Sequence, residues 1–170
     1  MSFSMVQRLL TVLILPFFGV LIGIGIFPGY LIFNAIENWS VSVGNDGLIH
    51  SLWFCIGLGM GYIAGGLGVV LVTGVFGAIF ALRGREGRFP LKSMITIRWG
   101  IALVFHRVAL LFLSTIVPSM FSTLYYKLMG LNMGNGVIIN SSRINDAPMI
   151  TLGDGAVSYT HLRAHETMAH

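Results

Sequence analysis

The sequence predicts a mainly α-helical membrane protein, with a two-helix transmembrane hairpin, helices at the membrane interface and a short β-rich segment. The 170 residues are 55% hydrophobic and only 9% charged, whereas a soluble domain carries about 25% charged residues. Two long runs lack any charge, one between Arg8 and Glu37 and one between Asp46 and Arg83. Each run exceeds the length of about 20 apolar residues that a helix needs to cross a bilayer core.

The first predicted helix covers residues 8 to about 35 and belongs to a hairpin assigned to residues 1–85. Pro16 and the sequence FPGY at 27–30 are the points where this helix is expected to bend or end. Its apolar run is longer than the core of about 7–15 residues in a signal peptide, and no small-x-small cleavage site follows it. We therefore expect a retained helix.

The second predicted helix lies within residues 48–82 and is rich in glycine. Gly57, Gly61 and Gly65 recur every four residues, which places them on one helix face and predicts close packing against another helix. A GxGxxG phosphate-binding loop is the competing interpretation, but that motif requires a preceding strand. The lone cysteine, Cys55, falls in the same apolar run and is interpreted as a small packing residue.

Positive charge is concentrated after the second helix. The segment RGREGRFPLKSMITIR holds five basic residues, whereas the connector ENWSVSVGNDGLIH holds two acidic residues and neither Lys nor Arg. Because Lys and Arg concentrate in cytoplasmic loops, we expect the N-terminus and everything after Arg83 inside, and the 37–50 loop outside, in a bacterial-type cell inner membrane. A nucleic-acid patch is disfavoured directly after a membrane span, so the expected partner is the lipid bilayer and no nucleic acid.

Residues 86–130 are predicted to form a basic turn followed by juxtamembrane interfacial helices, jointed near Pro118. The stretch 93–129 is hydrophobic, but His106 and Arg107 would lie near the centre of a third span. An Arg at that depth costs roughly 2.5–3.5 kcal/mol, which disfavours the spanning alternative without removing it. The His106–Arg107 pair is interpreted as an interfacial anchor, and binding of a phosphate or acidic substrate is the alternative.

Residues 131–155 change in character and are rich in Gly, Asn, Asp and Ser. Two similar units, MGNGVII and LGDGAV, begin at Met133 and Leu152, with apolar residues spaced between turn-forming ones. Such units are similar to short β-helix repeats. An ordinary β-hairpin or meander is the alternative that the pattern leaves open.

The order of these parts resembles the C-terminal region of non-ribosomal peptide synthetase-like membrane proteins of the polylysine-synthetase type. The matching phrase is lmGxxxGxxvxI, present here as Leu128 to Ile139. Asp146, Met149-Ile150 and Leu152 to Gly155 follow it in the same order as in that family. There, membrane helices alternate with left-handed β-helix modules related to hexapeptide-repeat acyltransferases. The resemblance implies that residues 131–155 are the first coil of a left-handed β-helix.

The resemblance also implies acyl or aminoacyl transfer, in which an amine or hydroxyl acceptor attacks the carbonyl of a small-molecule acyl donor. A general base, usually His, would lie on later coils, so the catalytic residues are unknown here and no cofactor is expected in this chain. We expect a truncated piece of such an enzyme that is inactive alone. The alternatives are a membrane-anchored hexapeptide-repeat sugar or polysaccharide O-acetyltransferase and a small, non-enzymatic membrane hairpin protein.

The C-terminal stretch THLRAHETMAH has the spacing of a metal site. His161 and His165 would share one helix face, with Glu166 and His170 nearby, and imidazoles one turn apart bind metal ions. However, residues 156–167 resemble one translated frame of a common transposase-based sequencing adapter. We therefore expect residues 156–170 to be a non-native, adapter-derived tail without a metal site. On this interpretation the natural sequence continues differently after Gly155, and Met1 is open to being an internal methionine of a longer protein.

Overall fold

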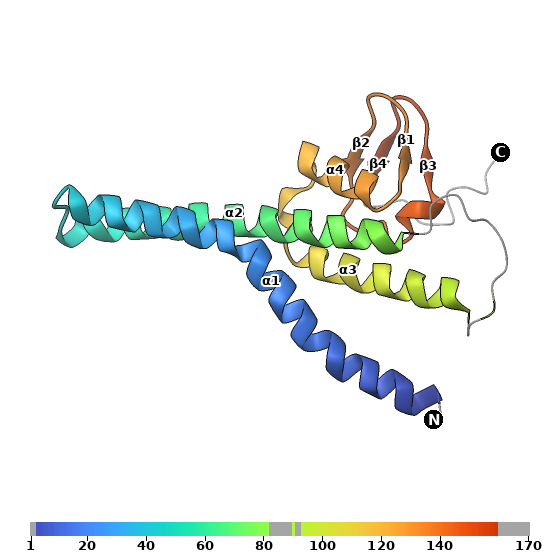
Figure 1. The fold of residues 1–170 in the computed structure, drawn as a ribbon. Coiled ribbons are helices and arrows are strands. Elements are labelled where there is room, and N and C mark those ends of the chain that lie inside the picture. Colours follow the sequence, from blue (N-terminus) through green and yellow to red (C-terminus); the bar gives the residue numbers. More distant parts are fainter. Residues whose placement is uncertain (1–2, 82–89, 91–92, 160–170) are drawn as a thin grey trace. The chain divides into compact units, whose positions relative to one another are not determined.

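The structure is a computed structural model that describes residues 3–81, 90 and 93–159 (Figure 1). The protein is mostly helical, and short strands follow the last helix. Within the described residues the elements are, in order, α1 (Phe3–Ser42), α2 (Gly47–Phe80), α3 (Met94–Ile116), α4 (Met120–Leu128), β1 (Asn132–Met133), β2 (Ile138–Asn140), the 3₁₀ helix η1 (Ala147–Met149), β3 (Thr151–Leu152) and β4 (Val157–Tyr159).

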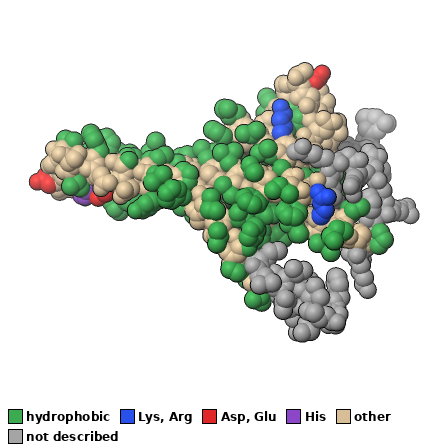
Figure 2. Space-filling view, in the orientation of Figure 1, with side chains coloured by type: hydrophobic (Ala, Val, Ile, Leu, Met, Phe, Trp, Pro, Cys, Tyr) green, Lys and Arg blue, Asp and Glu red, His purple; other side chains and the backbone are tan. Residues whose placement is uncertain are grey.

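The helices have the length and composition of membrane segments. Three described stretches are long and apolar enough to cross a membrane, namely Leu15–Ser42, Gly47–Phe80 and Met94–Ile116. Hydrophobic side chains cover much of the face drawn in Figure 2. The chain is therefore a membrane protein. The third stretch lies where the sequence favoured interfacial helices, and its length also fits the spanning alternative.

Contacts divide the chain into two compact units, residues 1–72 and 73–170, and the boundary falls within α2. In the first unit, α1 and α2 lie antiparallel, because the α1 neighbours shift from Ile36 back to Gly25 as α2 proceeds. Their closest approach is between glycines. A Cβ atom at Gly29 would overlap the backbone of Gly61, so these positions let the two helix backbones touch.

Gly57, Gly61 and Gly65 all lie on the side of α2 that faces α1. Their nearest α1 neighbours are the side chain of Phe33, the backbone of Gly29 and the backbone of Ile26, respectively. The missing side chains of these glycines let α2 approach the backbone of α1 closely.

α1 continues as a helix through Pro16 and Pro28 to Ser42. The FPGY sequence therefore does not end the helix, although it was one of the two outcomes expected there. A proline inside a helix removes one backbone hydrogen bond and favours a bend, and the α1 ribbon is visibly bent in Figure 1. Internal prolines are tolerated in membrane helices because neighbouring groups satisfy the freed backbone.

In the second unit, α3 packs against the last turns of α2. Phe105 is 1% exposed, and its ring stacks on those of Phe76 and Phe80 with centroids 6.1 and 5.8 Å apart. A Cβ atom at Gly77 would contact the sulfur of Met129, so this glycine lies directly against the Met129 side chain at the end of α4. These contacts are part of the buried core of the unit, which also includes Ala109, Leu113 and Ile139.

The break between α3 and α4 falls at Pro118. α3 ends at Ile116, and the residue before a proline is disfavoured in the helical conformation. Ser119 then caps α4, since its side chain accepts the Ser122 N–H while the Ser122 hydroxyl accepts the Ser119 N–H, both at 3.2 Å. This reciprocal capping box gives α4 a defined start.

The four strands form two parallel pairs. β1 pairs with β3 and β2 pairs with β4, with Asn132 opposite Thr151 and Ile138 opposite Val157. Both pairs thus join residues that are 19 apart in the sequence (132 to 151 and 138 to 157). A hairpin or meander joins successive strands antiparallel, so that alternative is wrong for these strands.

The turns repeat with the same spacing as the strands. Gly136 and Gly155 both have φ of +68°, a left-handed conformation that favours glycine. The Asn135 N–H donates to Oδ1 of Asp154 at 2.6 Å, and the Gly155 N–H donates to the Asn135 carbonyl at 2.8 Å. A Cβ atom at Gly134 would overlap the Asp154 carboxylate. The second turn is therefore held against the first by the Asp154 carboxylate and by a backbone hydrogen bond.

β4 lies in the segment expected to be adapter-derived. Its sequence, Val157-Ser158-Tyr159, contains a β-branched and an aromatic residue, both of which favour strands. Strand propensity alone is therefore enough to account for the pairing with β2, whatever the origin of this segment. The adapter origin of residues 156–167 stays a prediction.

Candidate functional site

The histidines of the C-terminal tail lie outside the described residues. His161, His165, Glu166 and His170 all belong to 160–170, so the structure does not place them. In the part of the chain that the structure describes, no group of three His, Cys, Asp or Glu residues could hold a metal ion. Candidate chemistry in the described residues must therefore be sought in pairs of polar groups and in pockets.

His106 and Arg107 lie in different environments on α3. His106 is 1% exposed, whereas Arg107 is exposed. The His106 Nδ1 lies 2.9 Å from the Tyr125 hydroxyl, and the two rings stack with centroids 5.8 Å apart. The interpretation of these two neighbours as one substrate-binding pair therefore has no support in the described geometry.

The His106–Tyr125 pair is closed to solvent. Tyr125 and Tyr126 have no exposed surface, and their rings meet edge to face at 5.3 Å. Burial raises the pKa of Tyr125 well above its usual range, and the neighbouring Tyr126 raises it further. Burial also raises the pKa of Tyr126. Both phenols keep their protons at neutral pH, and the cluster has the character of a buried contact between α3 and α4.

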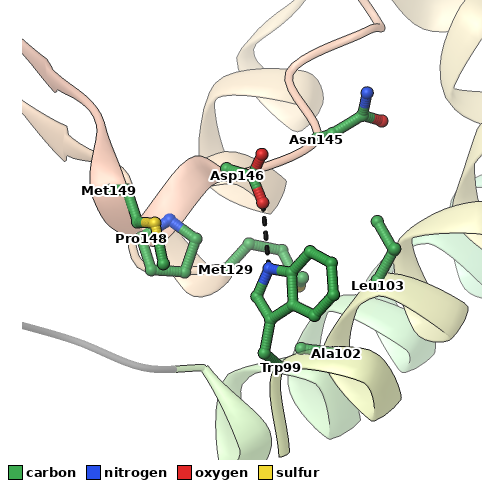
Figure 3. A pocket seen from close by; sticks show the side chains of 8 residues that line it. All are labelled: Trp99, Ala102, Leu103, Met129, Asn145, Asp146, Pro148 and Met149. Atoms are coloured by element: carbon green, nitrogen blue, oxygen red, sulfur yellow. Dashed lines mark hydrogen bonds between the residues drawn. The ribbon is translucent and has the colours of Figure 1, made fainter. Parts of the chain in front are cut away.

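A small pocket opens between α3, the end of α4 and the segment around η1. Its lining is largely apolar and has room for about one water molecule. In Figure 3 the Trp99 ring lies between Pro148 and Met149 on one side and Leu103 on the other. The lining residues are Trp99, Ala102, Leu103, Met129, Asn145, Asp146, Pro148 and Met149.

One carboxylate is held at this pocket. The Trp99 Nε1–H donates to Oδ1 of Asp146 at 2.9 Å, the dashed line in Figure 3. Asp146 occupies the N-cap position of η1, yet its side chain makes no capping hydrogen bond. The carboxylate is therefore committed to the indole and the pocket, not to the helix end.

A third polar cluster lies in the first unit, where α1 meets α2. Ser40 Oγ lies 3.4 Å from Nδ1 of His50, and Nε2 of His50 lies 3.3 Å from Oε1 of Glu37. The order Ser–His–Glu is that of a hydrolase triad. However, Ser40 has no exposed surface, and the Asn45 amide donates to its oxygen at 3.5 Å. A substrate carbonyl has no access to this hydroxyl, so the cluster is a polar clasp between the helix ends.

Neither the Trp99–Asp146 pair nor the His106–Tyr125 pair was predicted from the sequence. In the sequence, Asp146 was noted only as part of the family motif. Trp99 and Asp146 are 47 residues apart in the sequence, so no local sequence pattern connects them. A tryptophan near the start of an apolar helix and an acidic residue in a turn are the only signals that pointed to them.

Comparisons with protein-family models, with curated proteins and with solved structures find no match for this chain. The function is therefore inferred from the described contacts and from the motif in residues 128–155.

Proposed function

We propose that the chain is a truncated piece of a membrane-anchored enzyme that transfers acyl or aminoacyl groups, of the peptide synthetase-like kind. The observation that supports this best is the parallel pairing of β1 (Asn132–Met133) with β3 (Thr151–Leu152), because both strands precede the segment expected to be adapter-derived. It follows directly after the apolar helices, which is the order of parts that the family resemblance implies. In this proposal residues 131–155 are the first coil of a left-handed β-helix.

The register favours a coil because parallel strands need a return connection. The chain must travel back to the starting edge before it can pair in the same direction. Residues 141–150, including η1, supply that return within one 19-residue repeat. Each coil of such a solenoid contacts only its neighbours, so the same register can be repeated.

In the proposal α1 and α2 form a transmembrane hairpin with both ends of the chain on the cytoplasmic side of a bacterial-type inner membrane. The connector 37–50 carries Glu37 and Asp46 and neither Lys nor Arg, whereas five basic residues follow α2. Of these five, only Arg98 is described, and Arg83, Arg85, Arg88 and Lys92 lie outside the described residues. The proposed orientation thus rests on charge distribution.

We place α3 at the membrane interface. Arg107 is exposed near the middle of α3, and a cation at the bilayer centre costs roughly 2.5–3.5 kcal/mol. Trp99 on the same helix bonds the carboxylate of Asp146, which belongs to the polar β-rich segment. The exposed Arg107 cation and the Trp99–Asp146 hydrogen bond are both better accommodated at the headgroup level than within the hydrocarbon core.

The proposed reaction needs a base to take the proton of the attacking amine or hydroxyl. Among the described histidines, His50 belongs to the α1–α2 clasp and His106 is closed to solvent. Neither lies in the coil. The proposal therefore assigns the base to later coils and predicts that this chain alone is inactive.

The experiment that tests the proposal is to clone the locus from source DNA and to read past codon 155. The expected result is further apolar-Gly repeats and a coil that bears a histidine. A natural stop codon soon after Gly155 would contradict the proposal and favour a small, non-enzymatic membrane protein. Activity of the full-length protein with acetyl-CoA, and none with aminoacyl donors, would instead favour the O-acetyltransferase alternative.

A further inference from the structure

We propose that α4 lies on the headgroup layer of the bilayer and binds anionic phospholipid through its outward face, which is formed by Met120, Leu124 and Lys127. The proposal names a partner for a surface that the proposed function leaves without one. It rests on the part of the proposed function that places α3 at the membrane interface, because α4 follows α3 directly.

The inner face of α4 is fully used within the protein. Ser122, Tyr125 and Tyr126 have no exposed surface. A Cβ atom at Gly74 would lie 3.0 Å from the Tyr125 ring, so this face packs closely on the last part of α2. A partner of α4 must therefore bind on the opposite side of the helix.

The outward face of α4 is apolar and ends in a cation. Met120 is 77% exposed, Leu124 is 44% exposed, and Lys127 is exposed. Residues three and four positions apart lie on the same side of a helix. A helix that lies at a membrane surface buries such apolar side chains at the boundary between headgroups and acyl chains, while the lysine head stays at the level of the phosphates.

The last turns of α3, which lead into α4, have a matching surface. Leu111 is 61% exposed. The exposed hydroxyls of Ser114 and Thr115 donate to carbonyls four and three residues earlier in α3, at 3.4 and 2.6 Å. Because these hydroxyls are satisfied within their own helix, this surface needs no hydrogen bonds from water. It therefore suits the poorly hydrated boundary of a bilayer.

The charge of α4 selects among lipids. Its sequence, MFSTLYYKL, contains one lysine and no acidic residue. No Asp or Glu in the described part of the chain forms an ion pair with Lys127. The ammonium group is thus available to a lipid phosphate, and a lysine close to an anionic leaflet is attracted to it. Anionic headgroups are therefore favoured over zwitterionic ones.

A protein is a poorer partner for the same face. A stable protein–protein interface takes about 20–30 residues from each side, whereas the outward face of α4 offers the three named above. A bilayer has no such requirement, because the long apolar helices already hold the chain at the membrane. Lipid headgroups are then present beside α4 at high effective concentration.

The test of lipid contact uses the full 170-residue chain with Cys55→Ser, reconstituted in phosphatidylcholine vesicles. Leu124→Cys carries a bimane fluorophore, and lipids brominated on their acyl chains serve as quenchers. We expect quenching at Leu124→Cys and none at the control, Asn135→Cys, which lies in the exposed turn between β1 and β2. Equal quenching at the two positions, or none at Leu124→Cys, would overturn the proposal. A blue-shifted label without lipid quenching would indicate a protein partner and would also overturn it.

The test of lipid class compares brominated phosphatidylglycerol with brominated phosphatidylcholine at the same label. We expect a preference for phosphatidylglycerol on the order of fivefold, as one lysine at an anionic surface provides. Lys127→Gln should bring the ratio close to one, and Lys127→Arg should retain it. A ratio close to one in the parent protein, or an unchanged ratio in Lys127→Gln, would refute anionic lipid binding.

A salt series decides the matter if Lys127→Gln does not fold. At about 1 M KCl the Debye length falls to about 3 Å, so the preference of the parent protein for phosphatidylglycerol should be largely lost. A preference that survives at this salt concentration would contradict a role for the Lys127 charge.

This proposal and the proposed function fail separately. Lipid contact is measured on this chain without any transfer reaction, so its absence removes the lipid site of α4 and leaves the transferase to be decided by the sequence past codon 155. A stop codon after Gly155 removes the transferase and leaves a measured lipid contact standing.

Discussion

The indole N–H of Trp99 donates a 2.9 Å hydrogen bond to Oδ1 of Asp146, two residues that are 47 apart in the sequence. This bond ties α3 to the segment that leads into the second parallel strand of each pair. The bond also lies at the edge of the largely apolar pocket between α3 and the segment around η1.

Trp99→Phe should destabilise the folded chain by about 1 kcal/mol, because it keeps an aromatic ring and removes one hydrogen bond to a charged, partly exposed acceptor. Unfolding by sodium dodecyl sulfate titration in mixed micelles measures the change. Trp53→Phe is the control, since Trp53 meets Trp39 through an aromatic edge contact that a phenyl ring retains. Equal losses in the two variants would contradict a specific role for the N–H.

Gly29→Ala should disrupt the packing of α1 on α2. Its Cβ atom would overlap the Gly61 backbone, and such overpacking typically costs about 1–3 kcal/mol. Gly23→Ala on the same helix is the control, because a Cβ there meets nothing within 4 Å. It should be neutral or stabilising, since Ala is the better helix former. The same unfolding assay would refute the packing role of Gly29 if both variants behaved alike.

Gly155→Ala should destabilise the β-rich segment by about 1–2 kcal/mol, because Gly155 has φ of +68° and an alanine there is strained. Gly153→Ala is the control two residues away, where φ is not left-handed and a Cβ meets nothing within 4 Å. Protection of the Ile138 and Gly155 amides from hydrogen exchange reports on the segment directly. Similar loss of protection in both variants would show that the conformation of Gly155 is not what matters.

Alkaline pH should lower the free energy of unfolding. Burial raises the pKa of Tyr125 above its usual value of 10.0, and Tyr126 raises it further. Above about pH 10 the unfolded chain therefore releases a proton that the folded chain holds, so the stability present below that pH is lost as pH rises.

The pH dependence is measured as unfolding free energy between pH 8 and about pH 11. Tyr125→Phe should be less stable at neutral pH, because it loses the contact with His106, but its stability should fall less steeply above pH 10. Tyr62→Phe is the control, since Tyr62 is exposed. A slope in Tyr125→Phe equal to that of the parent chain would contradict the prediction.

The proposed topology can be tested by cysteine labelling. Val43 is 60% exposed in the α1–α2 connector, so a cysteine at this position can be reached by a labelling reagent. The nearby Ser40 is buried, and a cysteine there could not be reached. With Cys55→Ser, an engineered Val43→Cys should react with a membrane-impermeant maleimide added to cells whose inner membrane is intact. Asn135→Cys, in the exposed turn between β1 and β2, should react only after that membrane is opened. Labelling of Val43→Cys only after opening would reverse the proposed orientation.

The helical part of the fold was largely predictable, because an uncharged apolar run longer than about 20 residues has few alternatives to a membrane helix. The predicted helices at 8 to about 35 and within 48–82 correspond to α1 (Phe3–Ser42) and α2 (Gly47–Phe80). Their ends were less predictable. Pro28 suggested an early end, but helix packing through Gly25 and Gly29 carries α1 past it, and the connector is set by its own polar clasp around Ser40.

The β-rich segment was predictable only in part. The similar units at Met133 and Leu152 indicated a repeat, yet alternation of apolar residues does not say whether strands pair parallel or antiparallel. The 19-residue offset becomes informative once Gly136 and Gly155 are seen to share one backbone conformation. The Trp99–Asp146 pocket could not be predicted, because it depends on how α3 meets a turn far along the chain.

The offset between paired strands also constrains how a gene for such a segment can change in length. Losing or gaining one codon within a strand, such as β2 (Ile138–Asn140), would move the following residues of that strand to the opposite face. If the segment is the proposed β-helix, adding or removing one whole coil would leave each remaining pair in register. We therefore expect natural length variation in this region to occur in steps of complete coils, as unequal recombination between similar repeats produces, and single-codon changes to be confined to the turns.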